Sequence, residues 1–207
     1  MLKFNDPFDA DLEKFLAIRL GANYSKTARI RLALLSSELH CVACYRFGQY
    51  ARRLRAENAL FGVVFTVAHR IWDRWVTHVD SAHISRDAVI GPGFLIMHHT
   101  GIMIGEGKIG ANCTIHQNVT IGQGVAEGAT DVPTIGDNVW IGPGAIITGA
   151  VVIGDGVTIS AGTVLHKSVG PGLLVAGNPG RVVARDYDNS AMLGYPSTNK
   201  PAGSMEQ

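Results

Sequence analysis

The sequence has little cysteine, little charge and no long apolar run. Three cysteines among 207 residues are too few for a disulfide framework, and a net charge of +1 gives no case for a nucleic-acid partner. The most apolar window, residues 59–68, is much shorter than the roughly 20 residues that cross a bilayer. The first residues also lack the basic-then-apolar order of a signal peptide, so we expect a cytoplasmic protein.

Residues 1–78 are predicted to be α-helical. Apolar residues recur at helical spacing near the start, where Asp9 or Asp11 is the expected cap of the first helix. A serine and a glutamate open a second helix, expected over about residues 36–55, and a third is expected over 59–78. The start of the third helix is apolar all round, which favours burial against neighbours or another subunit.

Two features of this helical region have a structural and a functional interpretation. Cys41 and Cys44 have the CxxC spacing, but no second pair accompanies them, so we interpret them as structural rather than redox or metal-binding residues. Six arginines either form a solvated basic face or make a peripheral contact with an anionic membrane. They are Arg46, Arg52, Arg53, Arg55, Arg70 and Arg74.

From residue 84 onward, aliphatic residues recur with a period of six. They stand at positions 84, 90, 96, 102, 109, 115, 121, 135, 141, 147, 153, 159 and 165, and ten of the twelve steps are six residues. This period predicts hexapeptide repeats, each a short strand and a turn, with three repeats per coil. We therefore expect a mainly β protein: a left-handed parallel β-helix over residues 79–185, followed by a flexible polar tail over 186–207.

A second inward position is expected two residues before each aliphatic residue, where the side chains are mostly small. These residues are Ala88, Thr100, Cys113, Val119, Val139, Ala145, Val151, Val157 and Thr163. Glycines directly follow many of the aliphatic residues, where a Cβ would be costly: Gly91, Gly110, Gly122, Gly136, Gly142 and Gly154. Cys113 is accordingly interpreted as a core residue and not as a nucleophile.

Two steps break the period. The step from residue 102 to 109 holds one extra residue, and the step from 121 to 135 holds eight. The longer insertion predicts a protruding loop that forms a wall of a binding site on another subunit. Just before the shorter one stand two adjacent histidines, His98 and His99, which the fold does not require. The pair also lies upstream of the protruding loop, so we interpret it as functional.

The stretch HHTGIMIGE at residues 98–106 resembles the HATGIVVGE stretch of serine acetyltransferases. Residues 119–122, 138–142 and 176–179 are also similar to hexapeptide-repeat acetyltransferases, and the resemblance covers about residues 79–185. The helical region, with its Tyr45-Arg46 and His69-Arg70-Ile71, looks more like the short colanic acid acetyltransferases of exopolysaccharide synthesis. Those relatives also carry a double histidine.

The resemblance implies an acetyl-CoA-dependent O-acetyltransferase without a metal, in which His98 is the general base. His99 stands where serine acetyltransferases have alanine, and Asp80 is the nearest acid, about one coil away. The oxyanion formed from the thioester carbonyl would be stabilised by backbone N–H groups, and no covalent enzyme intermediate is required. Which of the two histidines is the base stays open.

Several positions depart from the pattern of serine acetyltransferases. Met97 stands in place of an aspartate, and His83 in place of a second carboxylate. Asp131 and Val132 replace an Arg-His pair that helps to bind serine. We therefore favour a hydroxyl of a sugar or exopolysaccharide precursor as the acceptor, with L-serine as the alternative. His116 is a further candidate for the acceptor pocket.

In this family coenzyme A lies along the outside of the coil, in the groove between two subunits. The resemblance implies contacts with the cosubstrate from Gly122, Gly124, Pro143 and Ala161, and with its phosphates from Lys167 and Arg181. It also implies a homotrimer, or a dimer of trimers joined through the helical region.

Two other functions compete with acetyl transfer. A γ-class carbonic anhydrase needs three histidines on zinc, and His98, His99 and His116 supply that number. The usual histidine pair five residues apart is absent, as are the expected carboxylates. A non-catalytic scaffold would need neither the double histidine nor the inserted loop.

Overall fold

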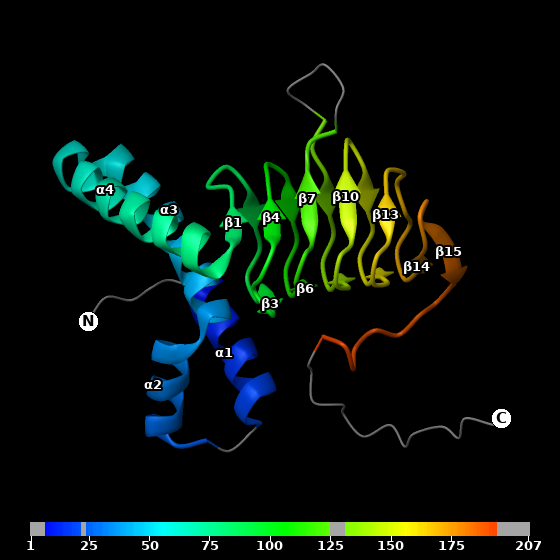
Figure 1. Ribbon diagram of the computed structural model, residues 1–207, viewed down its shortest axis with the longest axis horizontal. Coiled ribbons are helices and arrows are strands. Elements are labelled where there is room, and N and C mark those ends of the chain that lie inside the picture. The colour runs from blue at the N-terminus through cyan, green and yellow to red at the C-terminus, as the bar shows by residue number, and fades with distance from the viewer. Residues whose placement is uncertain (1–6, 22–23, 125–130, 194–207) are drawn as a thin grey trace.

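The computed structural model describes residues 7–21, 24–124 and 131–193. The helices gather at one end of a long coil of short strands, and the coil runs away from them along the axis of the molecule (Figure 1). The helical elements are α1 (Pro7–Leu20), α2 (Lys26–Leu35), α3 (Ser37–Glu57), α4 (Ala59–Trp75) and a π-helical turn, η1 (Val76–Asp80).

The coil has three faces, each a sheet of strands from successive turns. One face contains β1 (Ala82–Ile84), β4 (Ile102–Ile104), β7 (Thr120–Gly122), β10 (Ile146–Thr148) and β13 (Val164–Leu165). The second contains β2 (Val89–Ile90), β5 (Lys108–Ile109), β8 (Thr134–Ile135) and β11 (Val152–Ile153). The third contains β3 (Leu95–Met97), β6 (Thr114–His116), β9 (Trp140–Ile141), β12 (Thr158–Ile159), β14 (Leu174–Ala176) and β15 (Arg181–Ala184). Pairing is parallel throughout except between β14 and β15.

The predicted left-handed parallel β-helix is confirmed, and the six-residue period is its cause. All thirteen predicted aliphatic residues are buried, and those from Ile115 to Ile159 are no more than 2% exposed. Each stacks on its counterpart one coil away, as Ile96, Ile115 and Ile141 do along the third face. The core is therefore a continuous column of aliphatic side chains inside the coil, with Cys113 buried in it.

The strand register corrects the prediction at one place. Ile104, and not Ile102, pairs with Ile84 and Ile121, so Ile104 occupies the aliphatic position of the repeat. Ile102 pairs with Ala82 and fills the second inward position, while Thr100 is exposed. The assignment of Thr100 to the core and of one extra residue to the step 102–109 was therefore wrong. The insertion lies earlier, between Met97 and Gly101, and the following turn is one residue shorter.

The glycines that follow the aliphatic residues allow successive coils to approach closely. A Cβ on Gly142 would lie 2.7 Å from the backbone nitrogen of Ala161 in the next coil. Gly91, Gly110, Gly136 and Gly154 have similarly close backbone neighbours, which confirms the prediction for them. Gly122 is the exception, because a Cβ there would meet nothing within 4 Å.

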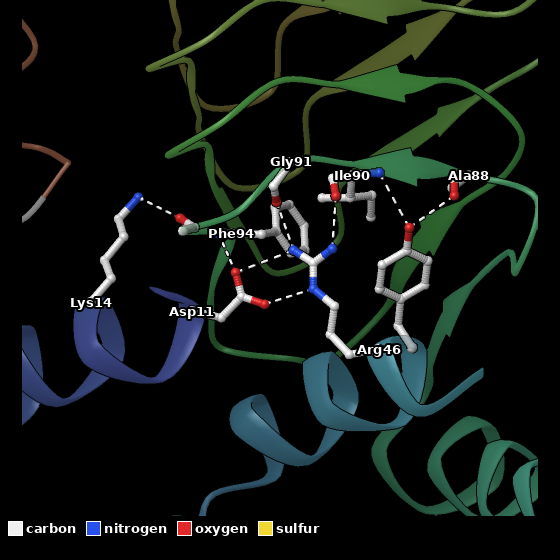
Figure 2. Close-up of polar contacts among 9 residues, drawn as sticks. Asp11, Lys14, Arg46, Ala88, Ile90, Gly91 and Phe94 are labelled. Carbon is white, nitrogen blue, oxygen red and sulfur yellow. Dashed lines mark hydrogen bonds and ion pairs between the residues drawn. The ribbon is translucent and has the colours of Figure 1, made fainter. Parts of the chain in front are cut away.

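Helices α1 and α3 cover the first coil through a buried ion pair (Figure 2). The guanidinium Nε of Arg46 donates to Asp11 Oδ2 at 2.7 Å, and the two side chains are 10% and 0% exposed. Arg46 also donates to the carbonyls of Ile90 and Gly91, and the backbone N–H of Phe94 donates to Asp11. The coil end thus receives the polar partners that a terminal repeat needs. The predicted capping role of Asp9 or Asp11 was wrong, because α1 begins at Pro7 and contains both residues.

Further contacts fasten the same helices to the coil. Lys14 Nζ donates to the carbonyls of Gly93 and Asn112, at 3.0 and 2.6 Å. The Tyr45 hydroxyl donates to the carbonyl of Ala88 and accepts from the N–H of Ile90. Arg46 therefore helps to attach α1 and α3 to the first coil and does not belong to an exposed basic face.

The helical region exposes two apolar surfaces, and the one on α4 belongs to the helix whose burial against neighbours or another subunit was expected. Helix α2 begins at the Ser25 cap and leaves three of its large apolar side chains exposed: Ile30, Leu34 and Leu35. Helix α4 packs on α3 but presents an apolar stripe outward: Leu60, Val64, Val67, Ile71 and Trp75. Among the described residues, no helix has the length and hydropathy to cross a membrane.

The region after β15 continues along the coil. The Asn189 side chain donates to the carbonyls of Asn138 and Gly156, and Leu193 is 2% exposed. The first part of the expected tail, up to Leu193, therefore contacts the coil, and residues 194–207 lie outside the described part of the chain. The expected boundary at residue 79 falls inside η1.

Candidate functional site

The two histidines lie in the insertion that the register reveals. β3 and β6 pair through Met97 and His116, and the corner after them needs one residue, Gln117, before the left-handed Asn118. The first coil has three residues at this point, from His98 to Thr100, before the left-handed Gly101. His98 itself has a φ of 62°, which is unusual for a residue with a side chain. Backbone strain of this kind clusters at functional sites.

An acidic side chain contacts one of the two histidines. His99 Nε2 lies 3.6 Å from Asp80 Oδ1, and the side chains are 26% and 4% exposed. Asp80 is the last residue of η1, and the left-handed Ser81 turns the chain into β1. Asp80, the acid predicted to lie nearest to His98, therefore contacts His99.

His99 also lies close enough to helix α3 for its charge to act on Glu38. Burial raises the pKa of Glu38, but the Ser36 hydroxyl and the charges of Arg19 and His99 outweigh burial and leave that pKa lowered. Glu38 accepts hydrogen bonds from Ser36 and Arg19 at 2.8 and 3.2 Å. His99 therefore faces acids from two elements, η1 and α3, while His98 is exposed to solvent.

His98 has neighbours on the third face of the coil. The pKa of His116 is lowered, first by burial and then by the charge of His98. The His116 ring meets the Trp140 ring edge to face, with centroids 4.9 Å apart. Trp140, which lies in the stretch 138–142 but was not predicted as a site residue, thus packs against His116.

Polar atoms without a partner gather at this corner. Six buried side-chain oxygens and nitrogens of the described residues have no hydrogen-bond partner, and three are Asp80 Oδ2, His99 Nδ1 and Gln117 Oε1. Buried polar groups are normally paired, so such a cluster is typical of a site that binds a ligand. The other three are threonine hydroxyls in the coil.

Two of the residues predicted to contact coenzyme A continue the same corner along the coil. The N–H of Gly144 donates to the carbonyl of Gln117, and the N–H of Gly162 donates to the carbonyl of Pro143. Gln117, Pro143 and the residue before Gly162, Ala161, therefore occupy equivalent positions on successive coils. The corner that carries the histidines thus extends towards the C-terminal end.

The other predicted contacts lie elsewhere on the coil. Gly122 ends β7 and pairs with Thr148, and the N–H of Gly124 donates to the carbonyl of Asp131 at 3.4 Å. Lys167, just after β13, and Arg181, the first residue of β15, are exposed. The loop between Gly124 and Asp131, predicted as the wall of a site, lies outside the described residues.

One departure from the serine acetyltransferase pattern has a structural explanation. Met97, in place of an aspartate, packs against a cluster that contains Phe15, Leu39 and Leu95. Helices α1 and α3 therefore make an apolar contact with the Met97 side chain. His83 is exposed on β1, beside Met103 of β4.

The carbonic anhydrase alternative gains no support within one subunit. Among the residues that the structure describes, His98, His99 and His116 do not bring their nitrogens within 4.8 Å of one another. His99 instead faces Asp80.

A coil of hexapeptide repeats with an unpaired polar corner defines the class of the hexapeptide-repeat transferases. Residues 133–167 match the family model described as bacterial transferase hexapeptide (six repeats). A serine acetyltransferase of Bacillus pumilus (strain SAFR-032) is 35% identical over 160 residues, which cover 76% of this chain and 69% of that protein. The chain therefore belongs to the serine acetyltransferase family.

Two further comparisons give the extent of the similarity. The serine acetyltransferase of Mycobacterium tuberculosis (strain ATCC 25618 / H37Rv) is 41% identical over 113 residues, and the match spans 48% of its length. The crystal structure of a Neisseria gonorrhoeae serine acetyltransferase in complex with serine is similar with a TM-score of 0.69 at 28% identity. That match covers 86% of this chain and 67% of the other.

Proposed function

We propose that this chain is an acetyltransferase that moves the acetyl group of acetyl-CoA to the hydroxyl of a small acceptor. The observation that carries the proposal is the inserted corner, where the exposed His98 stands beside the Asp80–His99 pair. Membership of the serine acetyltransferase family supports the reaction, and the equivalent positions of Pro143 and Ala161 support a pantetheine path along that corner.

The proposed step needs one base and no covalent enzyme intermediate. His98 accepts the proton of the acceptor hydroxyl while its oxygen forms a bond with the acetyl carbonyl carbon. The carbon–sulfur bond then breaks, and the departing thiolate takes the proton from the imidazolium. His99 lies beside Asp80 and positions the corner, and backbone N–H groups stabilise the developing oxyanion.

The relatives favour L-serine as the acceptor over a sugar hydroxyl. The curated relatives compared above are named serine acetyltransferases, and the Neisseria gonorrhoeae structure is a complex with serine. We therefore place L-serine first, which reverses the order drawn from the sequence.

A sugar or exopolysaccharide hydroxyl remains the second candidate because of specific residues. Asp131 and Val132 stand where the family carries the Arg-His pair for serine, so the cation for an amino-acid carboxylate is missing there. The Met97 side chain packs against helices α1 and α3. The aromatic wall of Trp140 beside His116 also suits a sugar ring.

We also propose how the chain assembles and how it contacts a membrane. We expect a homotrimer, in which the corner of one subunit faces the coil of the next, or a dimer of trimers. Peripheral contact with a membrane would involve the outward stripe of α4 and the exposed Arg70 and Arg74.

An acceptor screen tests the function. Purified protein is given acetyl-CoA with L-serine, homoserine or nucleotide sugars, and free thiol release is followed. Acceptor-dependent thiol release that His98→Ala abolishes supports the proposal, and the acceptor with the highest kcat/KM decides between serine and sugar. No release above the acceptor-free rate with any compound, together with no binding of coenzyme A, would favour the scaffold.

A further inference from the structure

A second cluster of reactive side chains lies in the helical cap, away from the corner of the histidines. Cys44 of α3 and His69 and Asp73 of α4 place one ligand atom each within 4.8 Å of the others. Cys44 is 2% exposed and His69 is 9% exposed, whereas Asp73 is half-buried. We propose that Cys44, His69 and Asp73 bind a divalent transition-metal ion of the zinc type.

The local structure explains how the three side chains meet. His69 and Asp73 are four residues apart on α4, so they lie on one face of that helix, the face towards α3. Gly48 of α3 makes room for the ring, because a Cβ at that position would collide with His69 Nε2. Helix α3 then presents Cys44 one turn before Gly48, next to the same ring.

The donor set is the one that zinc prefers. Thiolate, imidazole and carboxylate bind zinc at about 2.3, 2.0 and 2.1 Å, so ligand atoms around a tetrahedral ion lie roughly 3.5 Å apart. Side-chain shifts of about 1 Å therefore close the present arrangement around an ion. Three protein ligands leave a fourth position, and Asp73 and Cys44 both line a small cavity with Val76 and Ala82.

The charges of the ion and its ligands also balance. Binding follows Cys44–SH + M²⁺ → Cys44–S–M⁺ + H⁺, and the Asp73 carboxylate neutralises the remaining charge. Arg86 of the first coil interacts with His69 electrostatically and opposes a cation, so both anionic ligands are required. The bound ion would tie α3 to α4 just before η1, which delivers Asp80 to the corner of the histidines.

Metal binding to the full chain tests the proposal. Protein freed of metal with a chelator is titrated with Zn²⁺ and, separately, with Co²⁺, whose thiolate complexes absorb in the near ultraviolet. We expect one ion per chain, one proton released per ion and a thiolate–cobalt band. Cys44→Ser should remove the band, while Cys113→Ser, which changes a cysteine buried in the coil, should leave both the band and the stoichiometry unchanged.

A ligand variant without a change in size completes the test. Loss of even an outer partner weakens metal affinity about 10- to 100-fold, so Asp73→Asn should weaken Zn²⁺ binding by at least about 100-fold. The absence of a thiolate–cobalt band in the wild-type chain would overturn the proposal, whether or not the variants fold. So would unchanged Zn²⁺ affinity in Asp73→Asn.

Discussion

His99 Nε2 lies 3.6 Å from Asp80 Oδ1, while the adjacent His98 has a left-handed backbone and an exposed side chain. One histidine of the pair therefore lies beside an acid inside the subunit, and the other is exposed to solvent. This division of roles underlies the first two predictions.

His98→Ala should lower kcat by about 10²- to 10⁴-fold, which is the usual contribution of a positioned general base. The side chain is exposed, so the melting temperature should stay close to that of the wild type. Steady-state thiol release, with thermal unfolding as the fold check, measures both. His166→Ala, at an exposed position on the coil, is the matched control. Near-normal turnover without His98 would move the base to another residue.

Asp80→Asn should lower kcat less than His98→Ala does, because it changes the position of His99 and leaves the proposed base in place. The amide keeps the size of the side chain but loses the charge that holds His99, and misplaced catalytic groups cost up to about 100-fold in rate. We expect kcat to fall while KM for acetyl-CoA changes little, because Asp80 lies under the corner and not on the predicted pantetheine path. If His99→Ala and Asp80→Asn both lost more activity than His98→Ala, His99 would be the base instead.

The structure also shows which parts of the molecule local patterns can predict. The aliphatic period predicted the coil because each inward residue packs on another aliphatic residue one turn away, as Ile115 does on Ile141. The same logic misplaced Thr100, since Ile102 and Ile104 both fit the pattern and only strand pairing distinguishes them. Asp11 looked like a helix cap because its partner Arg46 is 35 residues away. Long-range pairs of this kind have no local signature.

The candidate site was also predictable only in part from local patterns. His98 and His99 were predictable because the fold does not need them. Gln117 and Trp140 were not, because each matches the repeat and becomes notable only beside the next coil. The Cys44, His69 and Asp73 cluster depends on how α3 and α4 pack, which helical periodicity alone does not specify.

The Asp11–Arg46 ion pair should be the main polar fastening between the helices and the coil. Burial raises the pKa of Asp11, although Arg46 and the N–H of Phe94 act against it. Breaking a buried pair from one side leaves an uncompensated charge, so Arg46→Met should destabilise the fold by about 3–5 kcal/mol. Urea unfolding measures this. Arg52→Met, which breaks a half-exposed pair with Asp87, should cost less than about 1 kcal/mol. Equal losses in the two variants would contradict the fastening role.

Gly142 should be far less tolerant of a methyl group than Gly170. A Cβ on Gly142 would lie 2.7 Å from Ala161 N, in a core where neither coil can move away. We expect Gly142→Ala to cost about 1–3 kcal/mol, as overpacking usually does. At Gly170 the nearest atom is 3.9 Å away, an ordinary contact, so Gly170→Ala should be neutral within about 0.5 kcal/mol. Thermal unfolding compares the two, and equal melting temperatures would show that the coils are loosely stacked.

Acid should destabilise the protein partly through His116. Its folded-state pKa is lowered by burial and by the charge of His98, so the unfolded chain binds more protons just below pH 6.5. Stability should therefore fall as the pH drops from about 6.5 towards the lowered value, and then level off for this group. His116→Gln removes the contribution, and urea unfolding at pH 7.5 and pH 5.5 should show a smaller acid loss than in the wild type. His166→Gln serves as the exposed control. An unchanged acid loss in His116→Gln would mean that the ring beside Trp140 titrates alike in the folded and unfolded chains.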